Sequence, residues 1–161
     1  MQTQLIIDNA ARPASNGATF ERRHPLSGEL ITTGAAATVE DAVAIAESSS
    51  SAFTAWSVSG PSTRRAILLK TADLLETKVQ EFSEVMAKEV GASELWAGFN
   101  VMASASLLRE AAGLTTQIQG ETLPTDKPGT VSMTMRQAAG VVLSIVPWNG
   151  PVLLGARAIA Y

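Results

Sequence analysis

Short apolar runs separated by turn residues make up the first part of the chain, residues 1–37. Leu5–Ile7, residues 18–20 and residues 30–33 are the apolar or β-branched runs, and Pro25 and Gly28 punctuate the segment between the last two. Such runs, bounded by Asp, Asn, Pro and Gly, are typical of short strands joined by turns. We therefore expect several short strands at the N-terminus.

Helical spacing of apolar residues begins at Thr38. Thr38 is a candidate N-cap, and Asp41 stands at the capping-box position three residues later. The apolar positions that follow recur with a period close to 3.6 and end at Phe53 and Trp56. We expect a helix here, with both aromatic side chains in the core.

Two further helical patterns follow. One begins at about residue 63 and continues to Gly91, which suits a C-cap. The next begins at Ser93 and carries apolar residues at helical spacing, from Trp96 to Leu107. The middle of the chain is therefore predicted to be helical.

The pattern changes to that of strands after Gly120. Residues 131–136 alternate between apolar and polar side chains, which indicates a half-buried strand. Residues 141–146 are apolar and β-branched apart from Ser144, and this predicts a strand covered on both faces. A turn and a helix-like segment follow, and together they resemble the opening of a βαβ unit in an α/β fold. Because that unit lacks its second strand, we expect the chain to be part of a longer protein.

Composition removes several classes of function. The chain has no Cys, which excludes a disulfide framework, a Cys-ligated metal site and a cysteine nucleophile within these residues. Its single His, His24, does not favour a His-based triad or metal site. The 12 Lys and Arg residues are outnumbered by 15 Asp and Glu, and no basic cluster exceeds a pair, so nucleic acid is not an expected partner. The N-terminus lacks a signal-peptide pattern and no apolar run approaches ~20 residues, so we expect no membrane segment and a soluble, cytoplasmic protein.

The turn after the predicted buried strand holds the most informative side chain. Ligands in open α/β sheets bind at the carboxyl ends of strands, and Asn149 lies at that point. Its amide group is an uncharged donor suited to stabilising a developing oxyanion. The residues alone leave open that Asn149 only caps a turn between prolines. Neither a Walker motif nor a G-x-G-x-x-G fingerprint is present.

The ordered segments of the chain resemble the NAD(P)-dependent aldehyde dehydrogenase superfamily. The similarity rests on Pro-Trp-Asn at residues 147–149, on His-Pro-Leu-Ser-Gly-Glu at residues 24–29 and on Ile-Gln-Gly-Glu-Thr-Leu-Pro at residues 118–124. It extends over the whole chain. The strongest local match, residues 89–100 together with residues 147–150, resembles the branch of the family that oxidises salicylaldehyde. We therefore expect NAD-dependent oxidation of an aromatic aldehyde, such as salicylaldehyde, in the catabolism of aromatic compounds.

The resemblance also implies roles for individual residues. Asn149 would donate to the oxyanion formed when a catalytic Cys attacks the aldehyde, with that Cys and the general-base Glu lying beyond Tyr161. The residues implied to line NAD are Ile145, Val146, Pro147 and Trp148.

The same resemblance divides the chain into three parts. Residues 1–127 would be strands and helices of the cofactor-binding domain, and residues 128–139 an oligomerisation strand. Residues 140–161 would supply the first strand, turn and helix of a Rossmann-like sheet. The oligomerisation strand implies a homodimer or homotetramer.

Four residues are candidates for the substrate pocket. Gly150 stands where many relatives carry a large aromatic residue, which leaves room for a substrate ring. Arg157 stands where many carry Trp, about two helical turns further on, and could meet a phenolic oxygen. Leu153, followed by Leu154, lies between them as apolar wall, and Trp96 could border the entrance. A surface role for Arg157 and a core role for Trp96 stay open, as do another aldehyde (benzaldehyde, vanillin or a semialdehyde) and a non-catalytic assembly module.

Overall fold

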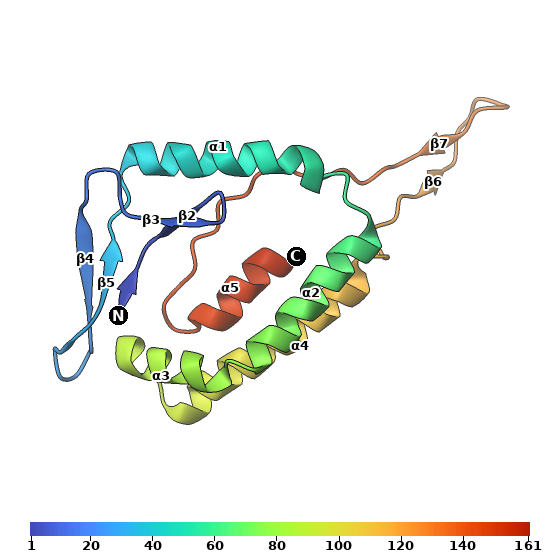
Figure 1. The fold of residues 1–161 in the computed structure, drawn as a ribbon. Coiled ribbons are helices and arrows are strands. Elements are labelled where there is room, and N and C mark those ends of the chain that lie inside the picture. The colour runs from blue at the N-terminus through green and yellow to red at the C-terminus, as the bar shows by residue number, and fades with distance from the viewer.

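Small sheets form the N-terminal end of the molecule in the computed structural model, which describes residues 1–161 (Figure 1). The strands are β1 (Gln2–Thr3), β2 (Leu5–Ile7), β3 (Ala10–Arg12), β4 (Thr19–Arg23) and β5 (Leu30–Ala35). β5 is the centre of a three-stranded sheet, parallel to β1 and antiparallel to β4, while β2 and β3 pair as a hairpin. Asp8 and Asn9 both have positive φ at the tip of that hairpin, as a type I′ turn requires. The expected short strands are confirmed.

Helix α1 (Val39–Trp56) begins at the predicted capping box. The Thr38 hydroxyl accepts from the Asp41 backbone N–H, and the Asp41 carboxylate accepts in return from the Thr38 N–H. Asp41 also accepts from the Ser15 backbone N–H, and these backbone bonds, that of Thr38 first, hold the pKa of its carboxyl below the usual range. The start of α1 is thereby attached to the segment after β3.

The prediction that Trp56 belongs to the core is wrong, because its side chain is 50% exposed. α1 lies along the outside of the molecule, and Asp41 is its one buried residue. Phe53, also expected in the core, is only partly buried. Helical periodicity identified the helix but not how much of it other elements cover.

The remaining helices are α2 (Pro61–Glu76), α3 (Val79–Val90), α4 (Glu94–Leu114) and α5 (Pro151–Ala160). The single helix predicted from about residue 63 to Gly91 is therefore two helices, separated at Thr77 and Lys78. No Gly or Pro marks this break. α2 packs along α4, whereas α3 also contacts β4 and β5, so tertiary packing separates them. Gly91 is in the left-handed conformation and caps α3 as predicted.

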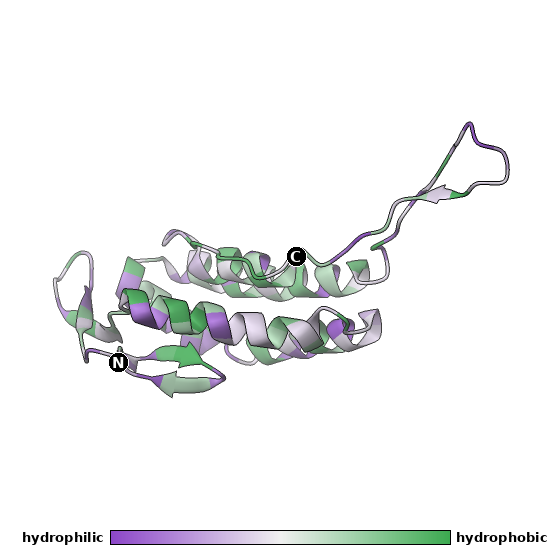
Figure 2. Cartoon of the chain, turned by 90° about the horizontal axis from the view of Figure 1, so that it is seen from above, coloured by the Kyte–Doolittle hydropathy of each residue, from purple (hydrophilic) through white to green (hydrophobic).

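The core is the contact between α2, α4 and α5. Ala72 of α2 and Ala105 of α4 are fully buried, together with Leu108, and Ala160 of α5 packs against them. Small side chains at a helix crossing allow the backbones to approach closely, so many contacts form over a small area. Outside this contact many apolar side chains on the helices stay exposed. Figure 2 colours the hydrophobic residues of the chain green.

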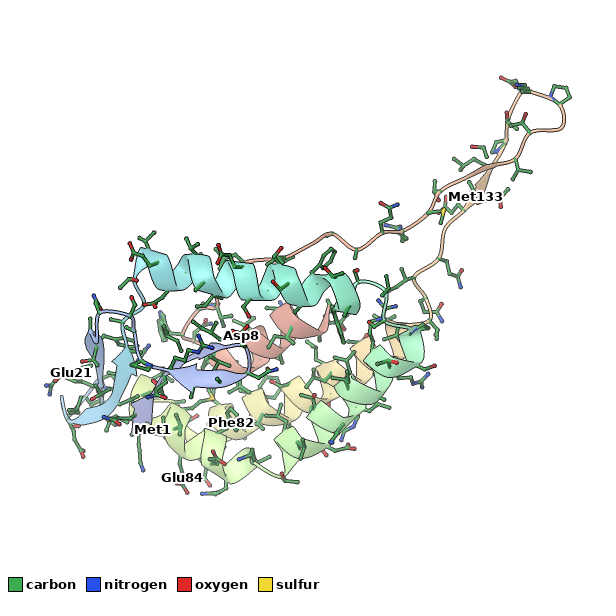
Figure 3. The ribbon with its side chains drawn as sticks, turned by 45° about the horizontal axis from the view of Figure 1, so that its top comes forward. Met1, Asp8, Glu21, Phe82, Glu84 and Met133 are labelled. Atoms are coloured by element: carbon green, nitrogen blue, oxygen red, sulfur yellow. The ribbon has the colours of Figure 1, made fainter.

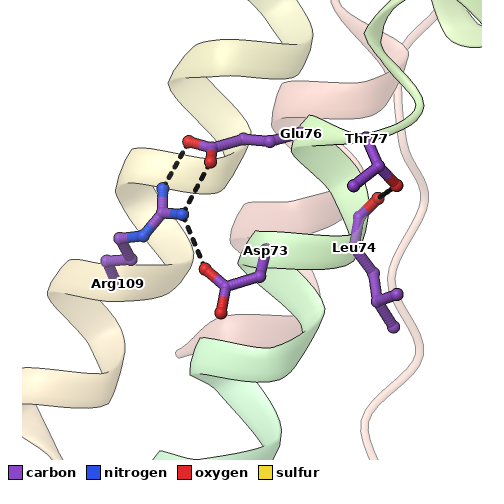
Figure 4. Close-up of polar contacts among 5 residues, drawn as sticks. All are labelled: Asp73, Leu74, Glu76, Thr77 and Arg109. Atoms are coloured by element: carbon purple, nitrogen blue, oxygen red, sulfur yellow. Dashed lines mark hydrogen bonds and ion pairs between the residues drawn. The ribbon is translucent and has the colours of Figure 1, made fainter.

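An ion-pair cluster fixes α2 against α4 at the edge of this core (Figure 4). The Arg109 guanidinium donates to both Glu76 carboxylate oxygens, at 2.6 and 2.8 Å, and to Asp73 at 2.8 Å. Hydrogen bonding from Arg109 lowers the pKa of Glu76, and the two carboxylates raise the pKa of Arg109. The two-pronged geometry sets the register between the two helices.

A hairpin projects away from the helices after α4 (Figures 1 and 3). Its strands, β6 (Thr122–Leu123) and β7 (Ser132–Met133), pair antiparallel. The strand predicted over residues 131–136 is therefore only two residues long. The Thr134 backbone N–H donates to the Glu121 carbonyl at 2.8 Å and closes the base of the hairpin.

The strand predicted over residues 141–146 does not form in this structure, and its expected burial on both faces is wrong here. The segment is extended, and Leu143 and Ile145 are 86% and 88% exposed. A strand needs a neighbour to accept and donate backbone hydrogen bonds, and no strand of residues 1–161 lies beside it. None of the helices has the length and apolar character needed to cross a membrane.

Candidate active site

The start of α5 determines where Asn149 lies. Gly150 is the N-cap residue, Pro151 occupies the first turn, and the Gly150 carbonyl accepts from the Leu154 N–H at 2.9 Å. Pro suits this position because its ring fixes φ and the missing N–H has no helical partner there. Asn149 therefore stands immediately before the positive end of a helix dipole, and it is exposed. This position favours negative charge next to its amide side chain.

Helix α4 holds the same turn through Trp96. The indole Nε1–H donates to the Asn149 backbone carbonyl at 2.9 Å, across 53 residues of sequence. α4 begins at Ser93, whose side chain accepts from the Trp96 N–H, so Trp96 lies in the first turn of the helix. Its ring stacks on Phe99 with a centroid separation of 5.4 Å and is 43% exposed. The structure thus brings together two of the residues predicted for the site.

Gly150 is buried against α4. A Cβ atom at Gly150 would lie 3.2 Å from Oδ1 of Asn100 and 3.7 Å from Cδ1 of Leu154. The absence of a side chain therefore allows the start of α5 to approach α4 closely. Of the two leucines predicted as apolar wall, both partly buried, Leu154 is the one that lies beside Gly150.

Asn100 is a residue that sequence reasoning did not select for the site. It is fully buried, its Nδ2 donates to the Trp96 carbonyl at 3.0 Å, and its Oδ1 has no hydrogen-bond partner. A buried oxygen without a partner is uncommon in folded proteins. The available signal was a polar residue one helical turn after Trp96, on a helix that otherwise buries small and apolar side chains.

The other predicted site residues are more dispersed. Ile145, Val146 and Pro147 form an exposed, extended segment, and Trp148, also exposed, begins the turn before α5. Arg157 is exposed on α5 and forms neither an ion pair nor a side-chain hydrogen bond within residues 1–161.

The largest groove, about 780 Å³, lies between α3 and α4. Phe99, on which Trp96 stacks, is one of its lining residues, but none of the predicted site residues lines it. His, Asp and Glu side chains do not gather anywhere into a group that could hold a metal ion. The predicted site residues therefore lie outside this groove.

Comparisons with known proteins identify the family. The model of the aldehyde dehydrogenase family matches residues 12–161. A salicylaldehyde dehydrogenase of Pseudomonas putida is 59% identical over 161 residues, which are 100% of this chain and 33% of that protein.

Solved structures have the same fold. A salicylaldehyde dehydrogenase from Pseudomonas putida G7, complexed with salicylaldehyde, superposes with a TM-score of 0.98 at 60% identity, covering 100% of this chain and 33% of that one. PnpE in complex with nicotinamide adenine dinucleotide superposes with a TM-score of 0.94 at 33% identity, covering 99% of this chain and 33% of that one. The chain thus spans about a third of the length of these relatives. Because the family model matches nearly the whole of this chain, the chain belongs to the aldehyde dehydrogenase family.

Proposed function

We propose that the complete protein oxidises an aromatic aldehyde, salicylaldehyde or a similar hydroxybenzaldehyde, to the carboxylate, with NAD+ as cofactor. The observation that carries the proposal is the exposed Asn149 at the start of α5, held through its backbone by Trp96. High identity to salicylaldehyde dehydrogenases supports the choice of substrate.

Asn149 acts on the aldehyde oxygen. As a nucleophile adds to the carbonyl carbon, negative charge develops on that oxygen, and the Asn149 amide N–H donates a hydrogen bond to it. The amide does not titrate, so this donor is present at every pH at which the protein is folded. The N-terminus of α5 adds a favourable dipole, and no acidic residue lies in its first turn to oppose it.

The segment before Asn149 fits the cofactor. Ile145 and Trp148 expose apolar surface. An apolar surface can pack against a flat ring. When bound, NAD+ supplies the hydride acceptor of the reaction.

Three residues select the substrate in this proposal. Gly150 brings no ring of its own to the turn, where even a Cβ would lie 3.2 Å from Oδ1 of Asn100, and Trp96 offers an indole face beside the turn. Arg157 has no ion-pair partner in this chain and offers a planar cation to the phenolic oxygen of a hydroxybenzaldehyde.

The proposal also covers the setting of the enzyme. We place it in the cytoplasm, in the catabolism of aromatic compounds, as a homodimer or homotetramer. The projecting hairpin supports assembly, since it exposes three apolar side chains near or on β7: Val131, Met133 and Met135.

A substrate panel tests the proposal. The complete protein is supplied with NAD+ and with salicylaldehyde, benzaldehyde, vanillin, succinic semialdehyde or hexanal, and NADH absorbance is followed. We expect kcat/KM to be highest for the hydroxybenzaldehyde. A preference for the semialdehyde or for hexanal contradicts the aromatic assignment, and no NADH with any aldehyde favours a non-catalytic assembly module instead.

Replacing Arg157 by Ala should reduce discrimination between salicylaldehyde and benzaldehyde. If the guanidinium binds the phenolic oxygen, its loss lowers the ratio of the two kcat/KM values by about tenfold, the usual effect of a hydrogen bond to a charged group. Arg157→Lys is the matched control, because it keeps the charge but not the planar pair of donors, and should give an intermediate ratio. If the ratio of the two kcat/KM values is unchanged in Arg157→Ala, Arg157 does not bind the hydroxyl group.

A further inference from the structure

The strongest unexplained contact of the site is the bond from the Trp96 indole to the backbone of Asn149. A residue that only lines a substrate pocket offers its ring and needs no partner for its N–H. Here Nε1 lies 2.9 Å from the Asn149 carbonyl oxygen, which is hydrogen-bond distance with the indole as donor. The N–H of Trp96 is thus engaged with the turn that carries Asn149.

This carbonyl helps to orient the Asn149 side chain. A peptide unit is planar, so a bond to its oxygen restricts the plane between Asn149 and Gly150 and with it the ψ angle of Asn149. The next carbonyl, that of Gly150, is held by the Leu154 N–H at 2.9 Å. The two bonds therefore narrow the range of directions open to the Cα–Cβ bond of Asn149.

Trp96 is itself held in place by its own helix. Phe99 stacks on the indole with an interplanar angle of 23°, and the buried Asn100 donates to the Trp96 backbone carbonyl at 3.0 Å. The free Oδ1 of Asn100 faces Gly150, 3.2 Å from where a Cβ would lie, so a Cα–H of Gly150 points toward it. One turn of α4 therefore touches the backbone on both sides of the peptide between Asn149 and Gly150.

We infer that Trp96 is a positioning residue, which orients the Asn149 amide for oxyanion stabilisation through its indole N–H. The inference rests on the proposed function, in which Asn149 is the oxyanion donor. Misplacing a catalytic group by about 1 Å can cost roughly 10² in rate, so a hydrogen bond that restricts ψ of Asn149 affects turnover. Because every aldehyde develops the same oxyanion, the effect of the Trp96 N–H, unlike that of its ring face, is independent of the substrate's ring.

The test replaces Trp96 by Phe in the complete protein, which keeps an aromatic ring and removes the N–H. We expect kcat to fall about fivefold, the usual effect of one neutral hydrogen bond, for salicylaldehyde and hexanal alike, with little change in KM. Trp56→Phe is the matched control: it makes the same chemical change on α1, where the structure gives the indole N–H no hydrogen bond, and it should leave kcat unchanged. Thermal unfolding of both variants is measured alongside.

A double-mutant cycle with Asn149→Ala separates this inference from the proposed function. If Trp96 acts through Asn149, Trp96→Phe has no further effect on kcat once the amide is gone. Two results overturn the positioning role while the function stands: full additivity of the two changes, or a rise in KM confined to aromatic aldehydes. If Asn149→Ala leaves kcat unchanged, the oxyanion role itself fails, and the inference falls with it.

Discussion

Replacing Asn149 by Ala should lower kcat by about 10²- to 10³-fold, the range found when one oxyanion-hole donor is removed. The Asn149 side chain is exposed and makes no hydrogen bond within residues 1–161, so its loss should not disturb the fold. The contact that anchors the turn uses the backbone carbonyl of Asn149 and persists in the variant. The expected signature is thus a fall in kcat with an almost unchanged thermal midpoint, measured by NADH absorbance and circular dichroism.

Asn149→Asp is the matched control for this prediction. It keeps the shape of the side chain but replaces the donor by a carboxylate, which repels a developing oxyanion, so kcat should fall at least as far as with Ala. If Asp retained most of the activity, hydrogen-bond donation by Asn149 would be excluded. A change confined to KM would likewise show that the amide binds the ground state and not the transition state.

Replacing Gly150 by Phe should lower kcat/KM for salicylaldehyde by about 10²-fold and for hexanal by much less. In the proposed pocket the new ring occupies the space of the substrate ring, and discrimination by filling such a space reaches this size even for small groups. A competing cause exists in the structure, because any Cβ at Gly150 lies 3.2 Å from Oδ1 of Asn100. The variant could therefore lose activity by pushing α5 away from α4.

Two further variants separate these causes. Gly150→Ala adds only the Cβ, so it tests the contact with Asn100 without filling the pocket, and we expect a loss of only a few-fold. Gly150→Phe combined with Asn100→Ala removes the oxygen that a Cβ would press on. If the double variant recovers salicylaldehyde activity, Gly150 matters for helix packing and the pocket assignment is wrong.

Features with short-range causes could be predicted from the sequence. The capping box of Thr38 and Asp41 and the left-handed C-cap at Gly91 depend on residues within one turn, and both are present. The turn and helix around Asn149 follow the same logic, since Gly150 and Pro151 mark a helix start.

Features with long-range causes were missed. Nothing in the residues around Thr77 breaks a helix, and the division between α2 and α3 arises from what each packs against. Residues 141–146 have the composition of a buried strand, yet a strand exists only with a partner. The bond from Trp96 to Asn149 crosses 53 residues, and no periodicity in either segment signals it.

The two ends of α4 differ in how deeply their side chains are buried. From Val101 onward its buried face makes most contacts of the core, whereas Leu95, Trp96 and Phe99 in its first turns are 85%, 43% and 52% exposed. Substitutions at the exposed positions of this first part cost little packing, because few contacts are lost there. In the proposed enzyme, exposed positions here that do not hold Asn149, such as Leu95, could therefore change without loss of folding, which makes the start of α4 a favourable place for natural divergence and for directed evolution of substrate preference.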